Sequence, residues 1–209
     1  MTITIVGLGP GAVDDLSLKA WRTLENAEKV YLRTERHPCV PHLPGRTVYE
    51  SFDHLYDSIE AFEDVYARIT ATLIEAAKTG DIVYAVPGDP LVGESTTTRI
   101  LAAAKEQSIT VNIVNGISFI EPMLTYLGID ALDGLQILDG LDIAAMHHPP
   151  INPEYPALIA QVYNRSVASD VKLTLMNQYL DEFQVTLIHG AGTEGQIVET
   201  VPLYEIDRS

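Results

Sequence analysis

Three short glycine-containing segments carry residues that could hold a ligand through backbone groups. They are VGLGPG at 6–11, VPGDP at 86–90 and VNGISF at 114–119. Gly7 and Gly9 in the first segment, together with Ala12 directly after it, match the spacing of a dinucleotide-binding turn, in which backbone N–H groups contact a pyrophosphate. Pro10 removes one such donor, and the pair Asp14–Asp15 would repel a phosphate at the helix entrance. Taken alone, the first segment is more typical of a tight turn that needs positive φ angles.

Each of the three segments follows an apolar run that predicts a β-strand. These runs are TITIV at 2–6, DIVYAVP at 81–87 and SITVNIV at 108–114. In parallel α/β sheets, ligands bind beyond the carboxyl ends of the strands. Three glycine turns at such ends therefore indicate one shared site. Asp89 in the second turn could accept a hydrogen bond from a ribose hydroxyl or an ammonium group, or it could serve only as a turn residue.

The elements around these turns alternate between strand and helix patterns through the first half of the chain. Leu18, Trp21 and Leu24 share one face of a helix that Asp14 or Asp15 could cap, and residues 57–78 carry a long amphipathic stripe ending near Gly80. The predicted strands between them are KVYLRT at 29–34 and RTVYESF at 46–52. Short βαβ connections favour a largely parallel sheet.

The pattern changes near residue 130, and we place a boundary within residues 116–132. We expect an α/β domain over 1–118 with a mainly parallel sheet, and a second α/β domain over 119–209 with a mixed sheet. The second domain should contain strands at 134–143, 157–164 and 184–192, a helix at 166–180, and a β-rich end at 195–207.

Composition limits the possible partners and the compartment. The chain has 209 residues, 46% of them hydrophobic, and a formal net charge of −16. This charge disfavours nucleic acid as a partner. We read no signal peptide and no membrane span. Cys39 is the only cysteine, which fits a reducing, cytoplasmic location.

Two further clusters contain side chains that could bind ions. His37, Cys39 and His42 resemble metal ligands, but they fall short of the four that a structural zinc site needs, so we expect no metal. Arg33, Arg36 and Arg46 could form one basic spot beside the acidic residue at position 35.

The three turns together resemble the tetrapyrrole (corrin/porphyrin) methylase superfamily. Four longer segments, VYLRTERHP, SFDHLYD, VYAVPGDPLV and QVYNRSVASDVKLTLM, are most similar to the YabN-like, methylase-type N-terminal domain of MazG-type proteins. This resemblance covers essentially the whole chain. It implies two α/β domains with a cofactor cleft between them, S-adenosylmethionine as cofactor, and a homodimer. The third turn has Asn115 where much of the family has proline, and Asp89 is the general superfamily form.

The resemblance also implies which positions contact the cofactor. Pro10 would line the adenosine side. Gly88 and Asp89 would contact the methionine or ribose part, with Val92 packing nearby. The other implied positions are Ser118 and Phe119 after the third turn, and Tyr163 and Gly192 in the second domain.

We therefore expect an S-adenosylmethionine-dependent methyltransferase with an unassigned small-molecule acceptor. The many carboxylates of a tetrapyrrole suit such an acidic chain poorly. No catalytic residue is assigned, because methyl transfer from a sulfonium needs little acid–base chemistry. The alternative is a non-catalytic cofactor-binding or dimerisation module that regulates a MazG-type pyrophosphohydrolase, fused or separate. A nicotinamide oxidoreductase is the least favoured reading, because of Pro10 and the pair Asp14–Asp15.

Overall fold

The computed structural model of the chain describes residues 1–208. Their contacts divide them into two compact units, Met1–Phe119 and a second unit that begins at Ile120. Each unit has its own sheet structure and its own apolar core, and each is described separately below. Among the described residues, no helix has the length and apolar character needed to cross a bilayer.

The first unit is built on a five-stranded sheet in the order β3-β2-β4-β1-β5. Every neighbouring pair in it is parallel, which confirms the parallel sheet predicted from the sequence. The strands are β1 (Thr2–Gly7), β2 (Lys29–Leu32), β3 (Val48–Ser51), β4 (Ile82–Val86) and β5 (Thr110–Val114). Because all five strands run the same way, their carboxyl ends lie along one edge of the sheet.

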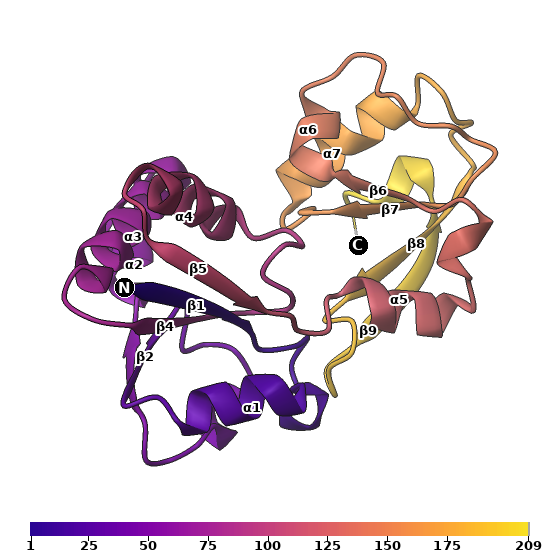
Figure 1. Cartoon of the computed structure of the whole chain (residues 1–209). Helices are drawn as coiled ribbons and strands as arrows, with labels where there is room; N and C mark the ends of the chain where they lie inside the picture. Colours follow the sequence, from indigo (N-terminus) through magenta and orange to yellow (C-terminus); the bar gives the residue numbers. More distant parts are fainter. Residues whose placement is uncertain (209) are drawn as a thin grey trace. The chain divides into compact units, whose positions relative to one another are not determined.

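Helices cover both faces of this sheet (Figure 1). Helix α1 (Leu18–Glu25) lies on one face, and α2 (Asp53–Ser58), α3 (Phe62–Ala77) and α4 (Ser95–Glu106) lie on the other. Strand β1 is buried from both sides, with Ile3 and Ile5 in the core beneath α3 and α4, and Val6 in the core beneath α1. The first glycine turn therefore follows a strand that is packed on both of its faces.

Helix boundaries in the first unit differ from the predicted ones in two places. Ser17 caps α1 by accepting a hydrogen bond from the Ala20 N–H at 3.1 Å, while Asp14 and Asp15 form a separate 3₁₀ turn. The predicted helix over 57–78 begins instead at residue 62, because Ile59 is extended and ends α2. Ile59 packs into the same apolar core as α3. Its side chain therefore continues the apolar stripe of that helix, although its backbone is not helical.

Gly80, near which the amphipathic stripe ends and where a helix C-cap glycine is typical, does not cap the helix. Helix α3 ends at Ala77, and Lys78 follows it in a right-handed conformation. Gly80 is absent from the glycines with positive φ, and no heavy atom lies within 4 Å of the place where its side chain would begin. Position 80 therefore tolerates other residues sterically.

The second unit contains parallel and antiparallel strand pairs in two separate sheets. Strand β6 (Gln136–Asp139) pairs in parallel with β7 (Ala157–Ala160), and β8 (Gln184–His189) pairs antiparallel with β9 (Ile197–Pro202). The helices are α5 (Ile120–Leu127), α6 (Gly140–Ala144) and α7 (Arg165–Leu175). Their core includes Ile143 from α6, Val171 from α7 and Val201 from β9.

Four of the predicted elements in the second unit are too long, among them the strand expected over 184–192, which stops at His189. The strand expected over 134–143 stops at Asp139, whose side chain accepts a hydrogen bond from the Leu141 N–H at 2.8 Å and starts α6. The strand expected over 157–164 stops at Ala160, because Asn164 caps α7 through the Val167 N–H at 2.9 Å. The helix expected over 166–180 ends at residue 175.

Candidate functional site: three backbone turns at the carboxyl edge of the sheet

The three glycine turns of the first unit lie side by side at the carboxyl edge of the parallel sheet. Gly7 at the end of β1 is in register with Val86 of β4, and Val6 is in register with Val114 of β5. Beyond the strands, the Gly9 N–H donates to the Gly88 carbonyl at 3.2 Å, and the Gly88 N–H donates to the Gly9 carbonyl at 2.8 Å. The backbones of the first two turns are therefore in direct contact beyond the ends of their strands.

Gly7 and Gly116 are needed because the turns approach one another closely. A Cβ atom on Gly7 would lie 2.5 Å from the Gly88 carbonyl oxygen and 2.6 Å from the Gly116 nitrogen. A Cβ atom on Gly116 would collide with the same Gly88 oxygen. Gly9 and Gly88 meet a second requirement, since their φ angles of +74° and +64° lie in the left-handed region. The glycines thus serve first to bring three backbones together.

The Asp89 carboxylate ties the second turn to the third. Its Oδ2 accepts from the Asn115 side-chain amide at 3.1 Å and from the Gly116 N–H at 3.2 Å. Its Oδ1 accepts from the Leu91 N–H at 2.8 Å. The residue is only 8% exposed. From the sequence, Asp89 could be a ligand contact or a turn residue. In the structure its carboxylate also bridges the second and third turns. The bridge explains the asparagine at position 115, whose side-chain amide donates to this carboxylate.

Four other predicted contact residues lie close to these turns. Pro10 follows Gly9 and is half-buried. The Val92 N–H donates to the Asp89 carbonyl at 3.1 Å. The Cα atom of Ser118 lies 3.9 Å from the place where a Gly88 side chain would begin, and Phe119 follows at the end of the first unit. The structure therefore places Pro10, Val92 and Ser118 beside the turns, and Phe119 directly follows Ser118 in the chain.

The two predicted contacts of the second unit lie in loops that follow strands. Tyr163 follows β7 and is exposed. Gly192, in the β8–β9 connection, has a φ of +80°, and its N–H donates to the Gln196 side chain at 2.9 Å. Gln161, directly after β7, has a φ of +62°, which is unusual for a residue with a side chain and is often found at functional sites. Only the polar character of this strand end indicated it from the sequence.

A buried histidine and a buried cysteine pack against the first turn. His37 Nε2 lies 3.1 Å from the Gly9 carbonyl, and because a carbonyl only accepts, Nε2 must carry the proton. The other ring nitrogen, Nδ1, then accepts from the Cys39 thiol, 3.1 Å away. Burial lowers the pKa of His37, and burial raises the pKa of Cys39 to about 11. At neutral pH this pair is therefore uncharged and packs beneath the turn.

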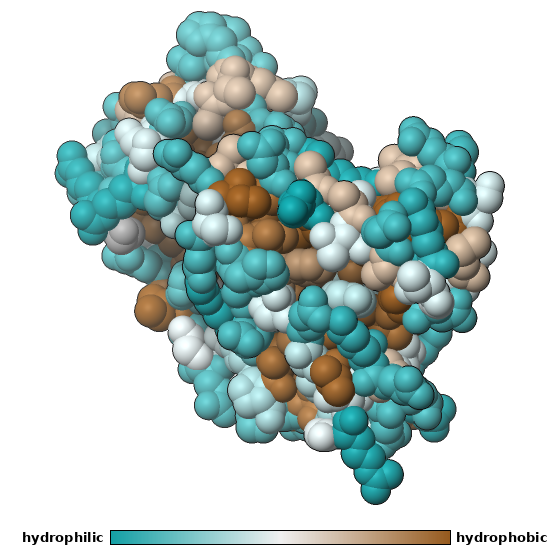
Figure 2. All heavy atoms as spheres, turned by 90° about the vertical axis from the view of Figure 1, so that its left-hand side faces the viewer, coloured by the Kyte–Doolittle hydropathy of each residue, from teal (hydrophilic) through white to brown (hydrophobic). Residues whose placement is uncertain are grey.

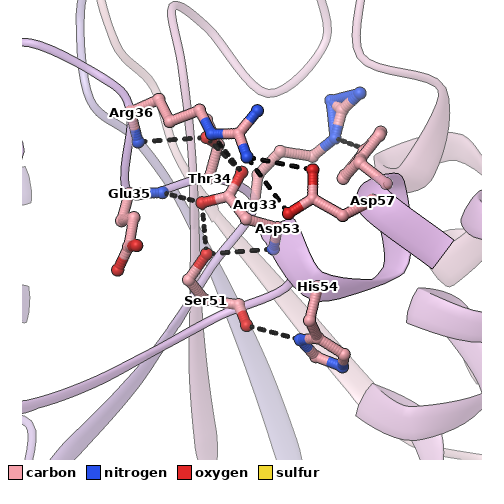
Figure 3. A network of polar contacts seen from close by, with 9 residues as sticks. Arg33, Thr34, Glu35, Arg36, Ser51, Asp53, His54 and Asp57 are labelled. Atoms are coloured by element: carbon pink, nitrogen blue, oxygen red, sulfur yellow. Dashed lines mark hydrogen bonds and ion pairs between the residues drawn. The ribbon is translucent and has the colours of Figure 1, made fainter.

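Next to the glycine turns, Asp53 organises the carboxyl ends of β2 and β3 (Figure 3). Its carboxylate accepts from the Thr34 hydroxyl at 2.7 Å, the Ser51 hydroxyl at 2.6 Å and the Glu35 N–H at 2.8 Å. Burial alone would raise the pKa of Asp53, but these hydrogen bonds and the Arg36 charge hold it below its ordinary value. The carboxylate is thus kept ionised and fixes the loop after β2.

The predicted basic spot of Arg33, Arg36 and Arg46 does not form. Arg33 pairs with Glu94 at 2.6 Å, and Arg36 pairs with Asp57 at 3.0 Å. Two of the three cations are therefore neutralised by carboxylates within the same unit. Among residues 1–208, no group of three or more histidine, cysteine and acidic side chains is arranged to hold a metal ion.

An open groove of about 950 Å³ lies at the opposite, amino-terminal end of the sheet. It is lined by strand residues such as Thr2 and Asn112 and by Lys19 and Arg22 of α1. Figure 2 turns the left-hand side of Figure 1, where β1 begins, to the viewer, and hydrophilic side chains cover most of it, with hydrophobic ones in separate patches. We assign the candidate site to the carboxyl edge instead, because only there do backbone turns from three strands converge.

Comparison with known proteins agrees with this fold. The family model for Tetrapyrrole (Corrin/Porphyrin) Methylases matches residues 2–207. The protein YabN of Bacillus subtilis, whose function is uncharacterised, is 36% identical over 208 residues, which is 99% of this chain. The chain spans only 42% of the length of that relative. A diphthine synthase of Methanospirillum hungatei is 31% identical over 137 residues, covering 64% of this chain and 49% of its own.

Solved structures show the same fold at lower sequence identity. Uroporphyrin-III C-methyltransferase from Thermus thermophilus superposes with a TM-score of 0.72 at 23% identity, covering 98% of this chain and 86% of its own. A second structure of that enzyme, in complex with S-adenosyl homocysteine, gives a TM-score of 0.67 at 19% identity, with 100% and 86% coverage. The family match over nearly the whole length, together with the YabN identity, shows that this chain belongs to the tetrapyrrole (corrin/porphyrin) methylase family.

Proposed function

We propose that this chain binds S-adenosylmethionine at the carboxyl edge of the first unit's sheet and acts as a methyltransferase. The observation that carries the proposal is the convergence of Gly7, Gly88 and Gly116, which places three loop backbones within contact of one another at that edge. The family supports it, as does the Thermus thermophilus relative of the same fold that was solved with S-adenosyl homocysteine.

The chemistry of the turns suits this cofactor better than a phosphate-bearing one. Asp14 and Asp15 follow the first turn, Pro10 provides no N–H, and the two nearby arginines, Arg33 and Arg36, are already paired. A nucleoside attached to an amino acid needs hydrogen-bond partners for its hydroxyl, ammonium and carboxylate groups, which loop backbones provide without net charge. A carboxylate has about four acceptor positions, so Asp89 keeps acceptor capacity beyond its three hydrogen bonds.

The bound cofactor would supply an activated methyl group, whose transfer to an acceptor atom neutralises the sulfonium charge. The residues of this chain then have to orient the two reactants and exclude water, and no side chain is required as a strong acid or base. We propose Pro10, Gly88, Val92, Ser118 and Phe119 as cofactor contacts of the first unit, with Asp89. From the resemblance, Tyr163 and Gly192 are proposed as contacts supplied by the second unit.

We propose an uncharged or cationic small molecule as the methyl acceptor. The chain carries a net charge of −16, and near the candidate site both Arg33 and Arg36 are neutralised by carboxylates. A substrate with many carboxylates, such as a tetrapyrrole, would be repelled, because neither arginine is free to neutralise it.

We further propose a cytoplasmic homodimer. The free, buried Cys39 and the family resemblance support this proposal.

A non-catalytic role is the second candidate. The chain spans 42% of the length of its YabN relative, so its counterpart there is one part of a longer protein. In that case this whole chain would bind S-adenosylmethionine, or only dimerise, and would regulate a MazG-type pyrophosphohydrolase. A cofactor-binding site is common to the methyltransferase and to the regulatory form that binds S-adenosylmethionine, and turnover separates those two.

Calorimetric titration with S-adenosyl homocysteine tests the binding step, with NADH as the control ligand. We expect binding of the first ligand and none of the second. A screen of amine and hydroxyl acceptors, with carboxylates as the disfavoured comparison, then follows the formation of S-adenosyl homocysteine from S-adenosylmethionine. Binding without turnover on any acceptor would favour the regulatory role, and absence of binding would refute both forms of the proposal that involve the cofactor.

A further inference from the structure

The loop that connects β4 to α4, residues 87–94, is fixed at both of its ends. At its beginning, Gly88 exchanges two hydrogen bonds with Gly9, and Asp89 accepts from Asn115 and Gly116. Its end is Glu94, which is 7% exposed and directly precedes α4. The contacts of Glu94 therefore decide how the far end of this loop is held.

Glu94 uses both carboxylate oxygens within the protein. Its Oε1 accepts from the Thr96 N–H at 3.0 Å and from the Thr96 hydroxyl at 2.6 Å, which caps the start of α4. Its Oε2 accepts from Arg33 Nη1 at 2.6 Å. The side chains of Glu94 and Arg33 are only 4% and 18% exposed. The loop end is thus joined to the carboxyl end of β2 by an ion pair that is largely removed from water.

Aromatic side chains hold the Arg33 guanidinium in one orientation. Its Nε donates to the Tyr56 hydroxyl at 2.5 Å, and its central carbon lies 5.3 Å from the Tyr56 ring centre and 5.2 Å from that of Tyr66. Figure 3 shows the guanidinium lying apart from the Asp53 carboxylate. On the other side of Glu94, the hydroxyl of buried Tyr84 lies 3.0 Å from that of Thr96.

Such an arrangement is poorly explained by stability alone. A buried ion pair adds little to the free energy of unfolding compared with well-packed apolar side chains. Its directional hydrogen bonds do, however, fix the geometry of the groups that they join. Arginine is suited to this task because its planar group can stack on rings and donate from several nitrogens at once. A lysine could keep the charge but not the stacking and the two defined bonds.

We propose that Arg33 and Glu94 are positioning residues that hold the 87–94 loop in its ligand-binding conformation. The inference rests on the proposed cofactor site, and it assigns a function to a pair that lies in the β2 and β4 loops rather than in the glycine turns themselves. Without the pair, the loop stays attached at Gly88 but loses the bond that joins its far end to the carboxyl end of β2. Cofactor binding then has to order the loop, which weakens affinity.

The test compares three variants with a matched control pair. The variants are Arg33→Met, Glu94→Gln and the double substitution. The controls are Arg99→Met and Glu63→Gln, because Arg99 and Glu63 also form an ion pair, and Arg99 also contacts the Tyr66 ring, but on an exposed surface. Calorimetry gives the dissociation constant for S-adenosyl homocysteine, and hydrogen exchange of residues 88–96 without ligand reports on loop order.

We expect each single variant to bind at least about tenfold more weakly than wild type, and the double variant to bind no worse than the weaker single one, because both changes break the same contact. Exchange at 88–96 should rise in all three variants, while the two controls stay within about twofold of wild type in affinity. Arg33→Lys should recover part of the affinity.

Each other outcome has its own meaning. If wild type binds and the variants bind equally well, the positioning role is refuted while the cofactor site stands. If wild type does not bind, the proposed function fails, and exchange in the free protein still tests the loop. Unchanged exchange at 88–96 in Arg33→Met and Glu94→Gln would overturn the inference in either case.

Discussion

Alanine at position 7 is expected to destabilise the protein strongly, whereas alanine at position 80 is not. The new methyl group of Gly7→Ala would lie 2.5 Å from the Gly88 carbonyl oxygen and 2.6 Å from the Gly116 nitrogen, where ordinary contacts begin at 3.4 Å. Both neighbours are backbone atoms, so neither can rotate away. The loops have to separate by about 0.9 Å, which is the shortfall at the Gly88 oxygen.

The energetic effect follows from what that separation disturbs. The Gly88 oxygen accepts from the Gly9 N–H, and the Gly116 nitrogen donates to Asp89, both at 3.2 Å. Overpacking of this kind costs about 1–3 kcal/mol, and weakening two hydrogen bonds adds about 1 kcal/mol each. We expect Gly7→Ala to lower the free energy of unfolding by about 3–5 kcal/mol.

Gly80→Ala is the matched control, and urea denaturation followed by circular dichroism is the assay. No heavy atom lies within 4 Å of the added methyl group at position 80. The substitution should leave stability unchanged or raise it by about 0.4–1 kcal/mol, because alanine restricts the unfolded chain. Similar small effects at positions 7 and 80 would refute the view that the three turns are packed against one another.

Three further outcomes follow from the same site. Asp89→Ala leaves the Leu91, Asn115 and Gly116 donors without their acceptor, so we expect a loss of about 2–4 kcal/mol in urea unfolding, and a loss below about 0.5 kcal/mol would contradict the bridging role. The lowered pKa of His37 means that the unfolded chain takes up a proton at higher pH than the folded one, so stability should decline as pH falls below about 6.5, by at most about 1.4 kcal/mol per unit. That part of the slope should disappear in His37→Gln, and an identical pH profile for the two proteins would show that His37 is not the group involved. The Cys39 thiol, buried and with its pKa raised to about 11, should react with a thiol reagent at pH 8 only at the rate of unfolding. Rapid labelling of the folded protein would contradict that burial.

The sheet of the first unit could be predicted from the sequence because local signals agreed with one another. Apolar runs at 2–6, 81–87 and 108–114 each lead into a glycine turn, and parallel pairing then brings those turns to one edge. Periodicity was less informative for helix boundaries. Ile59 continues the apolar stripe of α3 and shares its core, but its backbone is extended, and no glycine or proline marks the break.

The contacts that shape the site depend on spacing in three dimensions and left weaker traces in the sequence. Glycine at 7 and 116 indicated turns, but the near-collision of their backbones with Gly88 follows only from the register of β1, β4 and β5. The pairing of Arg33 with Glu94 joins residues 61 positions apart, and nothing in either segment indicates the other. Basic residues close in sequence therefore indicate a basic spot, although the carboxylate partners of Arg33 and Arg36 lie elsewhere in the chain.

A crystal structure of the protein with S-adenosyl homocysteine tests the central claim most directly. The account predicts density for the ligand against the Gly7, Gly88 and Gly116 turns, with the Arg33–Glu94 ion pair intact beside the 87–94 loop. Ligand bound only elsewhere, for example in the groove lined by Thr2 and Asn112, would contradict the assignment of the site to the carboxyl edge of the sheet.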